Sequence, residues 1–408
     1  MAIPHRLGSH ESEENLILNE ITKQFIRENL NADVPTLALK KAPVGTDVSL
    51  ALRQIGARQL LRKKVPEWSA NENLLFPNHL PIEQCSSEAT ARYKANLLKG
   101  NTFIDLTGGL GIDTYYINQA LALQNADYVE KSEALCDLAR HNFAELGANV
   151  EVHNETAEDY LSHCAPADCI FIDPARRDLY GRKTVSIADC TPNVVELQDL
   201  LLQKANTVMV KLSPMLDISK ALTELHSVKQ VHVTAVANEC KELVFILERG
   251  FAGQAELCCV NLQTTQHALR FALKEEQDCP LRLSERIGEY LYEPNAAVLK
   301  AGCFKLVCER FGVLKLHKNS HLYTSDTLVP DFPGRTFEVE GWALYNKKVR
   351  KELLDGVEKA SVAVRNFPLS VDELRKTLKV GDGDAVYLFA TTLEGERKVL
   401  VKTKKTAP

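Results

Sequence analysis

The chain has 408 residues, of which 45% are hydrophobic and 25% charged, with a formal net charge of −5. This length exceeds one ordinary core and predicts a globular protein of two or three domains. No apolar run approaches the ~18–20 residues of a membrane span, and the polar start MAIPHRLGSHESEE lacks the apolar core of a signal peptide. We therefore expect a cytoplasmic protein with no membrane partner.

The spacing of cysteines and histidines and the distribution of charge indicate which ligands the protein can bind. The eleven cysteines lack the paired spacing of a zinc site or a disulfide framework, so we expect buried thiols and no bound metal. His141, His153 and His163 are dispersed and are expected to be surface or core side chains rather than ligands. From Pro333 onward, fifteen Lys and Arg face eleven Asp and Glu, a local excess of four. Such a stripe suits either an RNA-binding appendage or a solvated face.

The chain begins with helical patterns and then changes character. Helix-spaced apolar positions at 12–29 and 48–62, together with 83–98, predict a helical N-terminal region over 1–85. Over 86–265, β-rich runs alternate with helical ones, at 102–106, 127–130, 149–153, 168–173, 206–211, 230–236, 242–247 and 255–262. This alternation predicts a parallel, doubly wound α/β sheet. The last two runs leave no room for a crossover helix, so we expect an antiparallel hairpin at the sheet edge.

After Cys279 the alternation stops. The stretch 292–312 (YEPNAAVLKAGCFKLVCERFG) predicts a helix with Pro294 in its first turn. The turn-rich stretch 327–334 predicts a boundary. Beyond it we expect strand, helix, strand (361–366), helix (370–378) and two strands joined near 393–396. The end of the chain therefore consists of small α+β modules, over 279–325 and 333–408.

The strongest local signal is the Gly-rich stretch FIDLTGGLGID at 103–113. A strand ends in Asp105, a glycine turn follows, and the next predicted strand ends in Glu130. The nicotinamide fingerprint G-x-G-x-x-G fails, because Thr114 stands where the third glycine belongs. A carboxylate aimed into the loop would also repel a pyrophosphate. S-adenosylmethionine carries an ammonium and a sulfonium instead, so Asp105 can accept from its ammonium, directly or through water.

Other residues complete the predicted cofactor site. Glu130 can accept from both ribose hydroxyls. In NETAEDYL, after the third strand, Thr156 and Ala157 are expected beside the adenine edge. The loop backbone is expected to approach the cofactor at Thr107, Gly108, Gly109 and Gly111.

The fourth strand ends in IDPARRD, 172–178. With DLTGGLG, VEK and DPAR as motifs I, II and IV, the chain resembles class I S-adenosylmethionine-dependent methyltransferases. Taken whole, it resembles the bacterial group with a C-terminal THUMP-like domain, as EQCSSEATARYKA, KLSPMLD, NECKEL and RNFPLSVDELRK also indicate. The resemblance implies a Rossmann-like sheet of order 3-2-1-4-5-7-6, a ferredoxin-like module over 279–325 and a THUMP-like domain over 333–408. It also implies Gln84 at the methionyl end of the cofactor, and an RNA substrate, since true THUMP domains bind structured RNA.

Asp173 and Pro174 lie where such enzymes orient the acceptor. Amino-nitrogen methylases of bases carry (D/N)PP(Y/F/W) there, but Ala175 and Arg176 leave this chain without the stacking aromatic. Uracil C5 methylases attack through a cysteine of a later segment. Cys240 has a suggestive place, but its surroundings do not match, and we expect an ordinary structural thiol.

A second constellation surrounds the same corner. Ribose 2′-O-methyltransferases use a Lys–Asp–Lys–Glu tetrad at positions that correspond to Lys94, Asp173, Lys211 and Glu242. The alternatives are a structural Lys211–Glu242 ion pair or other substrate contacts. Adjacent guanidiniums suit bidentate phosphate contact, which we expect of Arg176 or Arg177, although pairing with nearby carboxylates would also satisfy them.

These observations leave three readings. The first is a methyltransferase that acts on structured RNA, ribosomal or transfer, by in-line displacement. The second keeps the enzyme but takes a protein or a small molecule as acceptor, and the third is a non-catalytic RNA-binding protein that retains the fold. The intact acidic and glycine positions of the loop argue against the third reading. The methylated atom and the oligomeric state stay open.

Overall fold

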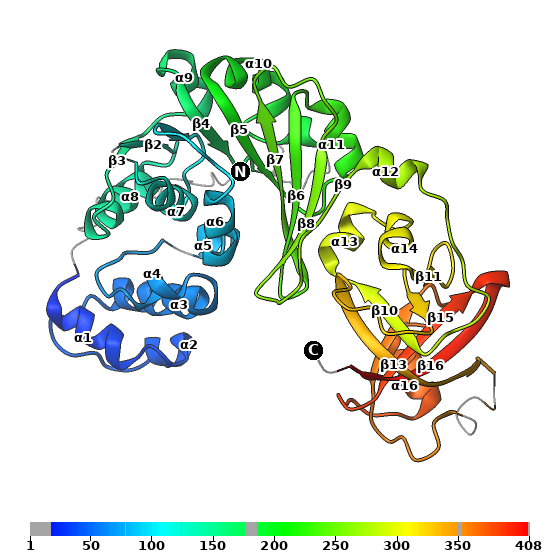
Figure 1. The fold of residues 1–408 in the computed structure, drawn as a ribbon. Coiled ribbons are helices and arrows are strands. Elements are labelled where there is room, and N and C mark those ends of the chain that lie inside the picture. The colour runs from blue at the N-terminus through cyan, green and yellow to red at the C-terminus, as the bar shows by residue number, and fades with distance from the viewer. Residues whose placement is uncertain are drawn as a thin grey trace, which may run out of the picture. The chain divides into compact units, whose positions relative to one another are not determined.

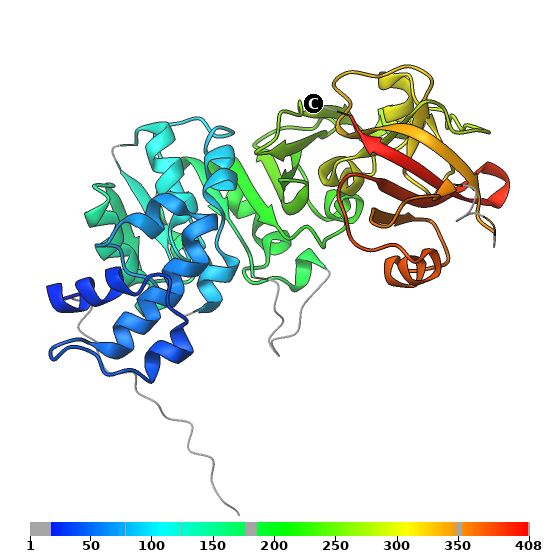
Figure 2. The same ribbon diagram turned by 90° about the horizontal axis from the view of Figure 1, so that it is seen from below.

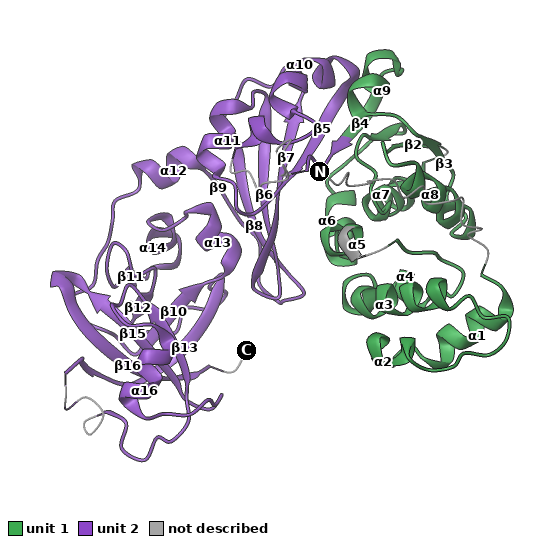
Figure 3. Ribbon diagram, turned by 180° about the vertical axis from the view of Figure 1, so that it is seen from behind, with its two compact units in different colours: residues 1–170 green, residues 171–408 purple. Residues whose placement is uncertain are grey.

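The computed structural model describes residues 18–77, 79–123, 125–175, 186–346, 348 and 353–406. It divides into two compact units, 1–170 and 171–408 (Figure 3). No helix in the described part of the chain combines the length and the apolar character of a membrane span.

The N-terminal helices, blue in Figure 1, pack together through one apolar cluster. This cluster includes Phe25, Ile55, Leu75 and Leu138. Buried Arg58 donates to four backbone carbonyls between Ser69 and Leu74 and so fixes the turn that follows α4. These helices confirm the predicted helical start of the chain. They are α1 (Glu20–Glu28), α2 (Val34–Ala38), α3 (Val48–Lys64), α4 (Pro66–Ala70), α5 (His79–Gln84) and α6 (Glu88–Ala95).

A nine-stranded sheet follows, in the order β3-β2-β1-β4-β5-β7-β6-β8-β9. Its first seven strands confirm the predicted α/β class and the order 3-2-1-4-5-7-6. Six consecutive residues of β7 are buried, the pattern of a strand covered on both faces. The strands are β1 (Phe103–Asp105), β2 (Ala126–Val129), β3 (Val150–His153), β4 (Ala167–Ile172), β5 (Ala205–Leu212), β6 (Val228–Val236), β7 (Glu239–Glu248), β8 (Glu256–Leu262) and β9 (Leu269–Ala272). The helices are α7 (Ile112–Leu121), α8 (Glu133–Glu145), α9 (Ala157–His163), α10 (Val194–Lys204), α11 (Ile218–Glu224) and α12 (Leu273–Asp278), with the 3-10 turn η1 (Ile187–Asp189).

The expected hairpin between the last two runs of this region is wrong. β7 is antiparallel to both β5 and β6, whereas β8 pairs with β6 in parallel (Figure 1). The hairpin forms between β6 and β7 because Ala237 and Asn238 both adopt positive φ, which suits a two-residue turn between antiparallel strands. Since β7 returns the chain to the start of β6, β8 needs no crossover helix.

The single helix expected over 292–312 is also wrong. Pro294 ends the strand β10 (Tyr290–Pro294), and Asn295 caps α13 (Ala296–Ala301). Gly302, with a φ of 74°, then ends that helix before α14 (Leu306–Phe311) begins. A left-handed residue cannot continue a helix, and glycine adopts this conformation without the steric penalty of a Cβ.

The C-terminal strands form one seven-stranded sheet, in the order β11-β12-β10-β13-β16-β15-β14. α16 packs Leu374 and Leu378 against Leu388 and Leu400 of the sheet (Figure 2). The strands are β11 (Leu314–Lys315), β12 (Tyr323–Ser325), β13 (Gly334–Leu344), β14 (Ser361–Arg365), β15 (Tyr387–Leu393) and β16 (Arg397–Lys405), with α16 (Val371–Leu378) and the 3-10 turn η2 (Glu394–Glu396). After residue 333, β13, β14, α16, β15 and β16 follow the predicted order, whereas the helix expected before β14 falls largely outside the described residues.

Candidate functional site

Aromatic rings hold the Gly-rich loop of the first unit from behind. A Cβ on Gly108 would lie 2.0 Å from the Tyr128 ring, and one on Gly111 would lie 2.7 Å from the Phe143 ring. The Tyr128 hydroxyl donates to the carbonyl of Gly109 at 2.6 Å. The protein's own packing therefore demands two of the predicted glycines. Sequence reasoning missed Tyr128, although its place beside Glu130 in the second strand was a usable signal.

Asp105 is a buried carboxylate that organises this loop. It is only 1% exposed, and its Oδ1 accepts from the backbone N–H of Thr107 at 2.9 Å. Its Oδ2 accepts from the hydroxyl of Thr114 at 2.6 Å. Thr114 is the residue that breaks the dinucleotide fingerprint, and its hydroxyl holds the carboxylate in the loop.

Glu130 closes the other side of the loop. Its Oε2 accepts from the N–H of Gly109 at 3.2 Å, and its Oε1 accepts from the N–H of Ser132 at 2.9 Å. A carboxylate offers about four acceptor positions, so these two bonds leave each oxygen able to accept from a ligand hydroxyl.

The hydrogen-bonding groups of the loop suit a ligand that carries a positive charge and a diol. The N–H groups of Gly108, Gly109 and Gly111 bond to Val129, Glu130 and Gly108, at 2.9, 3.2 and 2.8 Å. A phosphate would therefore meet two carboxylates instead of free amides. The Cβ side of Gly109 is open, since the nearest atom there is 3.8 Å away. S-adenosylmethionine, with its ammonium, sulfonium and ribose diol, fits these groups.

Three other predicted cofactor residues also lie in the first unit. Gln84 ends α5 and is exposed. Thr156 caps α9, where its hydroxyl accepts from the N–H of Asp159 at 3.1 Å and donates to that carboxylate at 2.8 Å. Ala157, the first residue of α9, is buried. The hydroxyl of Thr156 thus acts as the N-cap of α9.

Lys94 belongs to a buried cluster between α6 and α7. Its ammonium lies 3.2 Å from Oδ1 of Asp113 and donates to the hydroxyl of Ser86 at 3.0 Å. Ser86 in turn donates to Oδ2 of Asp113 at 2.6 Å. Within its unit, Lys94 therefore joins the two helices. The tetrad that would combine Lys94 with three residues of the second unit stays a prediction.

In the second unit, Lys211 forms a short ion pair with Asp173. Asp173 follows the carboxyl end of β4, and Pro174 beside it is buried. Glu242 is buried in β7, two residues before Val244, which pairs with Lys211. Because strand side chains alternate, Lys211 and Glu242 point to the same face of the sheet. The ion pair with Asp173 is therefore present at Lys211, and the expected pairing of Lys211 with Glu242 stays a prediction. Arg176 and Arg177 fall outside the described residues.

Cys240 is half-buried near the start of β7. Burial raises the pKa of its thiol to about 11, against a smaller lowering by Lys300. Because the thiolate is the nucleophile, such a thiol is poorly prepared for attack at neutral pH. This agrees with the expectation of a structural thiol.

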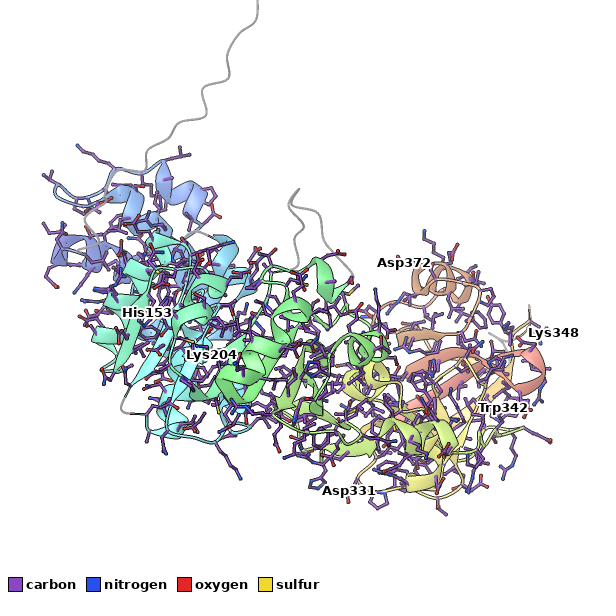
Figure 4. The ribbon with its side chains drawn as sticks, turned by 90° about the horizontal axis from the view of Figure 1, so that it is seen from above. His153, Lys204, Asp331, Trp342, Lys348 and Asp372 are labelled. Carbon is purple, nitrogen blue, oxygen red and sulfur yellow. The ribbon has the colours of Figure 1, made fainter. Side chains whose placement is uncertain are left out.

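His153, which Figure 4 labels, has two acidic neighbours in the structure. Ligand atoms of Asp127, Glu151 and His153 lie within 4.8 Å of one another, close enough to hold a metal ion. His153 Nε2 already lies 3.4 Å from the Asp127 carboxylate and 3.4 Å from the Tyr160 hydroxyl.

The sheet order, its antiparallel seventh strand and the acidic Gly-rich loop define a class I methyltransferase. Residues 290–333 match a ferredoxin-like domain model and residues 334–404 match a THUMP domain-like model. The crystal structure of a protein from Porphyromonas gingivalis W83, classed as a methyltransferase, is 34% identical with a TM-score of 0.84, and the match covers 95% of this chain and 98% of that one.

Two sequence relatives agree. Uncharacterized S-adenosylmethionine-dependent methyltransferases of Mycobacterium tuberculosis strains CDC 1551 / Oshkosh and H37Rv are 23% identical over 301 residues, which cover 73% of this chain and 79% of theirs. The chain belongs to the family of class I S-adenosylmethionine-dependent methyltransferases with a THUMP-like domain. It is an enzyme that takes its methyl group from S-adenosylmethionine.

Proposed function

We propose that this enzyme methylates structured RNA, either ribosomal or transfer RNA. The observation that carries the proposal is the THUMP domain-like segment at 334–404, because true THUMP domains bind structured RNA. We keep the division into 1–85, 86–265, 279–325 and 333–408 as part of the proposal. In this proposal, the segments 1–85, 279–325 and 333–408 bind the RNA, and the segment 86–265 transfers the methyl group.

The carboxylates of Asp105 and Glu130 are proposed to bind the cofactor. When bound, S-adenosylmethionine supplies a methyl group on a sulfonium. Glu130 accepts from the ribose diol with the acceptor positions that Gly109 and Ser132 leave open. Asp105, oriented by Thr107 and Thr114, accepts from the methionyl ammonium, directly or through water.

The acceptor corner is proposed to act mainly by positioning. Asp173 and Pro174 orient the acceptor atom, and Lys211 holds the Asp173 carboxylate in place through their ion pair. Glu242 shares the sheet face of Lys211 and adds negative charge there. In-line displacement needs chiefly such alignment, because effective molarity supplies much of the rate. Arg176 and Arg177, which follow directly in the sequence, are proposed to contact phosphate.

The test uses S-adenosylmethionine with a tritiated methyl group and the full-length protein. Total RNA, DNA and protein fractions from cells that lack this gene are offered as acceptors. We expect label in a discrete RNA species, and far less label with the Asp173→Asn variant. Label confined to protein would contradict the RNA proposal and favour the second reading of the sequence. The absence of both label and cofactor binding would contradict the catalytic proposal itself.

A further inference from the structure

The turn that follows β5 presents Met215 to solvent. The N–H of Leu216 donates to the carbonyl of Ser213 at 3.1 Å, and the N–H of Met215 donates to the Ser213 hydroxyl at 3.2 Å. Pro214 occupies the second position of this turn, where its fixed φ suits the turn geometry. Met215 is 73% exposed, whereas its neighbour Leu216 is only 2% exposed. The exposed methionine therefore stands on a well-fixed turn.

A lysine from the ferredoxin-like segment reaches the same turn. Lys300, near the end of α13, donates from Nζ to the carbonyl of Leu216 at 2.7 Å. α13 packs against β6, β7 and β8, so the lysine projects from a supported helix. No carboxylate of the described residues pairs with Lys300. An ammonium has three donors, so two remain for a ligand.

Lysines of the C-terminal strand β16 differ from Lys300, because Lys398, Lys402 and Lys404 each lie near a carboxylate. Lys402 lies 3.3 Å from Glu340, and Lys404 lies 3.1 Å from Glu338, across the β13–β16 pair. Their charge is therefore offset by carboxylates on the neighbouring strand. Lys300 keeps a positive charge that an anion can use.

Both side chains lie in the second unit, where the chain or a charge effect connects them to residues of the proposed acceptor site. Met215 lies four residues after Lys211, which pairs with Asp173. The ammonium of Lys300 influences the thiol of Cys240, two residues before Glu242. The motif after Asp173 lacks the aromatic residue on which a base would stack. Another apolar side chain would therefore have to contact the face of the base.

We propose that Met215 and Lys300 bind the nucleotide that carries the methylated atom. Met215 contacts the face of the base, because a thioether packs favourably on aromatic rings. Lys300 contacts a backbone phosphate, as a charge-assisted donor. The inference rests on the proposed RNA function and deepens it: the ferredoxin-like segment supplies part of the acceptor site.

The first test isolates the charge of Lys300. Fluorescein-labelled total tRNA and fragmented rRNA are titrated with full-length protein at several salt concentrations, with S-adenosylhomocysteine present. Lys300→Gln keeps an N–H donor for the Leu216 carbonyl but removes the charge. We expect the slope of log affinity against log salt to become shallower by about 0.7–0.9, the value for one phosphate contact. Lys300→Arg should restore the slope.

The matched control is Lys229→Gln, which makes the same change at the amino end of β6, where Lys229 already pairs with Glu248 at 2.5 Å. Its salt slope should equal that of the wild type. The second test is Met215→Ala, which should weaken RNA binding about 2- to 10-fold at fixed salt, as expected for one sulfur–aromatic contact, without changing the slope. Met215→Leu keeps most of the apolar surface and should lose less.

The outcomes separate this inference from the function on which it rests. If the wild type binds RNA and both Lys300→Gln and Met215→Ala bind like it, the inference is wrong and the proposed RNA substrate stands. If the wild type binds neither RNA pool, both proposals fail. A loss of binding by Lys300→Gln that Lys300→Arg does not reverse would indicate a damaged turn and would also overturn the phosphate contact.

Discussion

One hydroxyl decides which ligand class the Gly-rich loop can accept. Thr114 stands where a dinucleotide-binding loop has glycine, and its hydroxyl donates to Asp105 at 2.6 Å. With the N–H of Thr107, this bond fixes a buried negative charge inside the loop. A fixed carboxylate repels phosphate and attracts an ammonium, so the choice between the two cofactor classes is electrostatic.

The first prediction concerns that charge. Asp105→Asn should weaken binding of S-adenosylhomocysteine, which retains the methionyl ammonium, by about 10- to 100-fold, the range for a hydrogen bond to a charged group. Isothermal titration calorimetry measures the change. Asp127→Asn, a change of the same kind outside the loop, should bind normally. An unchanged affinity in Asp105→Asn would contradict the ammonium assignment.

The second prediction separates catalysis from cofactor binding. Asp173→Asn keeps the shape of the side chain but weakens its attraction for Lys211 and for the acceptor. Transfer in single turnovers should fall by about 100-fold or more, because small losses of alignment cost that much. Cofactor affinity should stay within a few-fold. Normal turnover by this variant would show that the acceptor corner lies elsewhere.

The third prediction concerns Cys240. Cys240→Ala should transfer methyl groups at the wild-type rate, because a thiol whose pKa burial raises to about 11 is protonated at neutral pH. Because burial disfavours the thiolate in the folded state, the fold should lose stability as the pH rises from about 9 toward 11. Urea unfolding between pH 9 and 11 should therefore show a smaller loss of stability in Cys240→Ala than in the wild type. Loss of activity in this variant would restore the cysteine as a nucleophile.

At the scale of elements, the loop between β1 and α7 depends on the strand and helix that pack behind it. Tyr128 of β2 and Phe143 of α8 occupy the space that side chains at Gly108 and Gly111 would need. A ligand is therefore not the reason for these two glycines. The Cβ side of Gly109 is open, and we propose that the backbone approaches the cofactor there.

The fourth prediction compares two glycine substitutions. Gly108→Ala forces a Cβ into the Tyr128 ring and should lower the free energy of unfolding by about 1–3 kcal/mol, as overpacking does. Gly56 lies inside α3, where an added Cβ would meet only Val34, at 3.9 Å. Gly56→Ala should raise the free energy of unfolding by about 0.5–1 kcal/mol. Urea denaturation measures both, and equal effects would contradict the packing argument.

At the scale of the whole molecule, the two C-terminal family segments share one sheet and one apolar cluster. Leu291 and Leu316 pack in that cluster with Phe389 and Val401. His317 adds a polar link, because its Nε2 lies 3.1 Å from the Glu396 carboxylate. The ferredoxin-like and THUMP-like segments therefore fold as one body.

The fifth prediction follows from this shared core. A chain that ends at residue 333 removes β13 to β16 and leaves β10 paired with β12 alone. Its segment 290–333 should lose protection, because much of its buried apolar surface would face water. Limited proteolysis with mass spectrometry should find early cleavage within 290–333, whereas the full chain should resist there. Equal resistance would show that the two segments fold independently.

Much of the fold could be read from local patterns. Alternating strands and helices, the acidic Gly-rich stretch and the turn near residue 334 depend on neighbours in the sequence, and the structure agrees with them. The two wrong predictions concern strand pairing and the end of a helix. The turn through Ala237 and Asn238 carries no glycine, so the local pattern does not indicate the β6–β7 hairpin. The single Gly302 interrupts the helical pattern over 292–312 only weakly, so that pattern predicts one continuous helix.

By itself, the sequence determined the α/β class, the acidic Gly-rich loop and the residue that ends the first strand, since hydrophobic period and turn chemistry act over short range. Only the tertiary structure decided which carboxylate meets Lys211, which rings require the loop glycines and which segments share the C-terminal sheet. It also brought Lys300 to the turn of Met215, across 84 residues of sequence. Such pairings depend on how distant elements pack, and no local pattern in the chain specifies them.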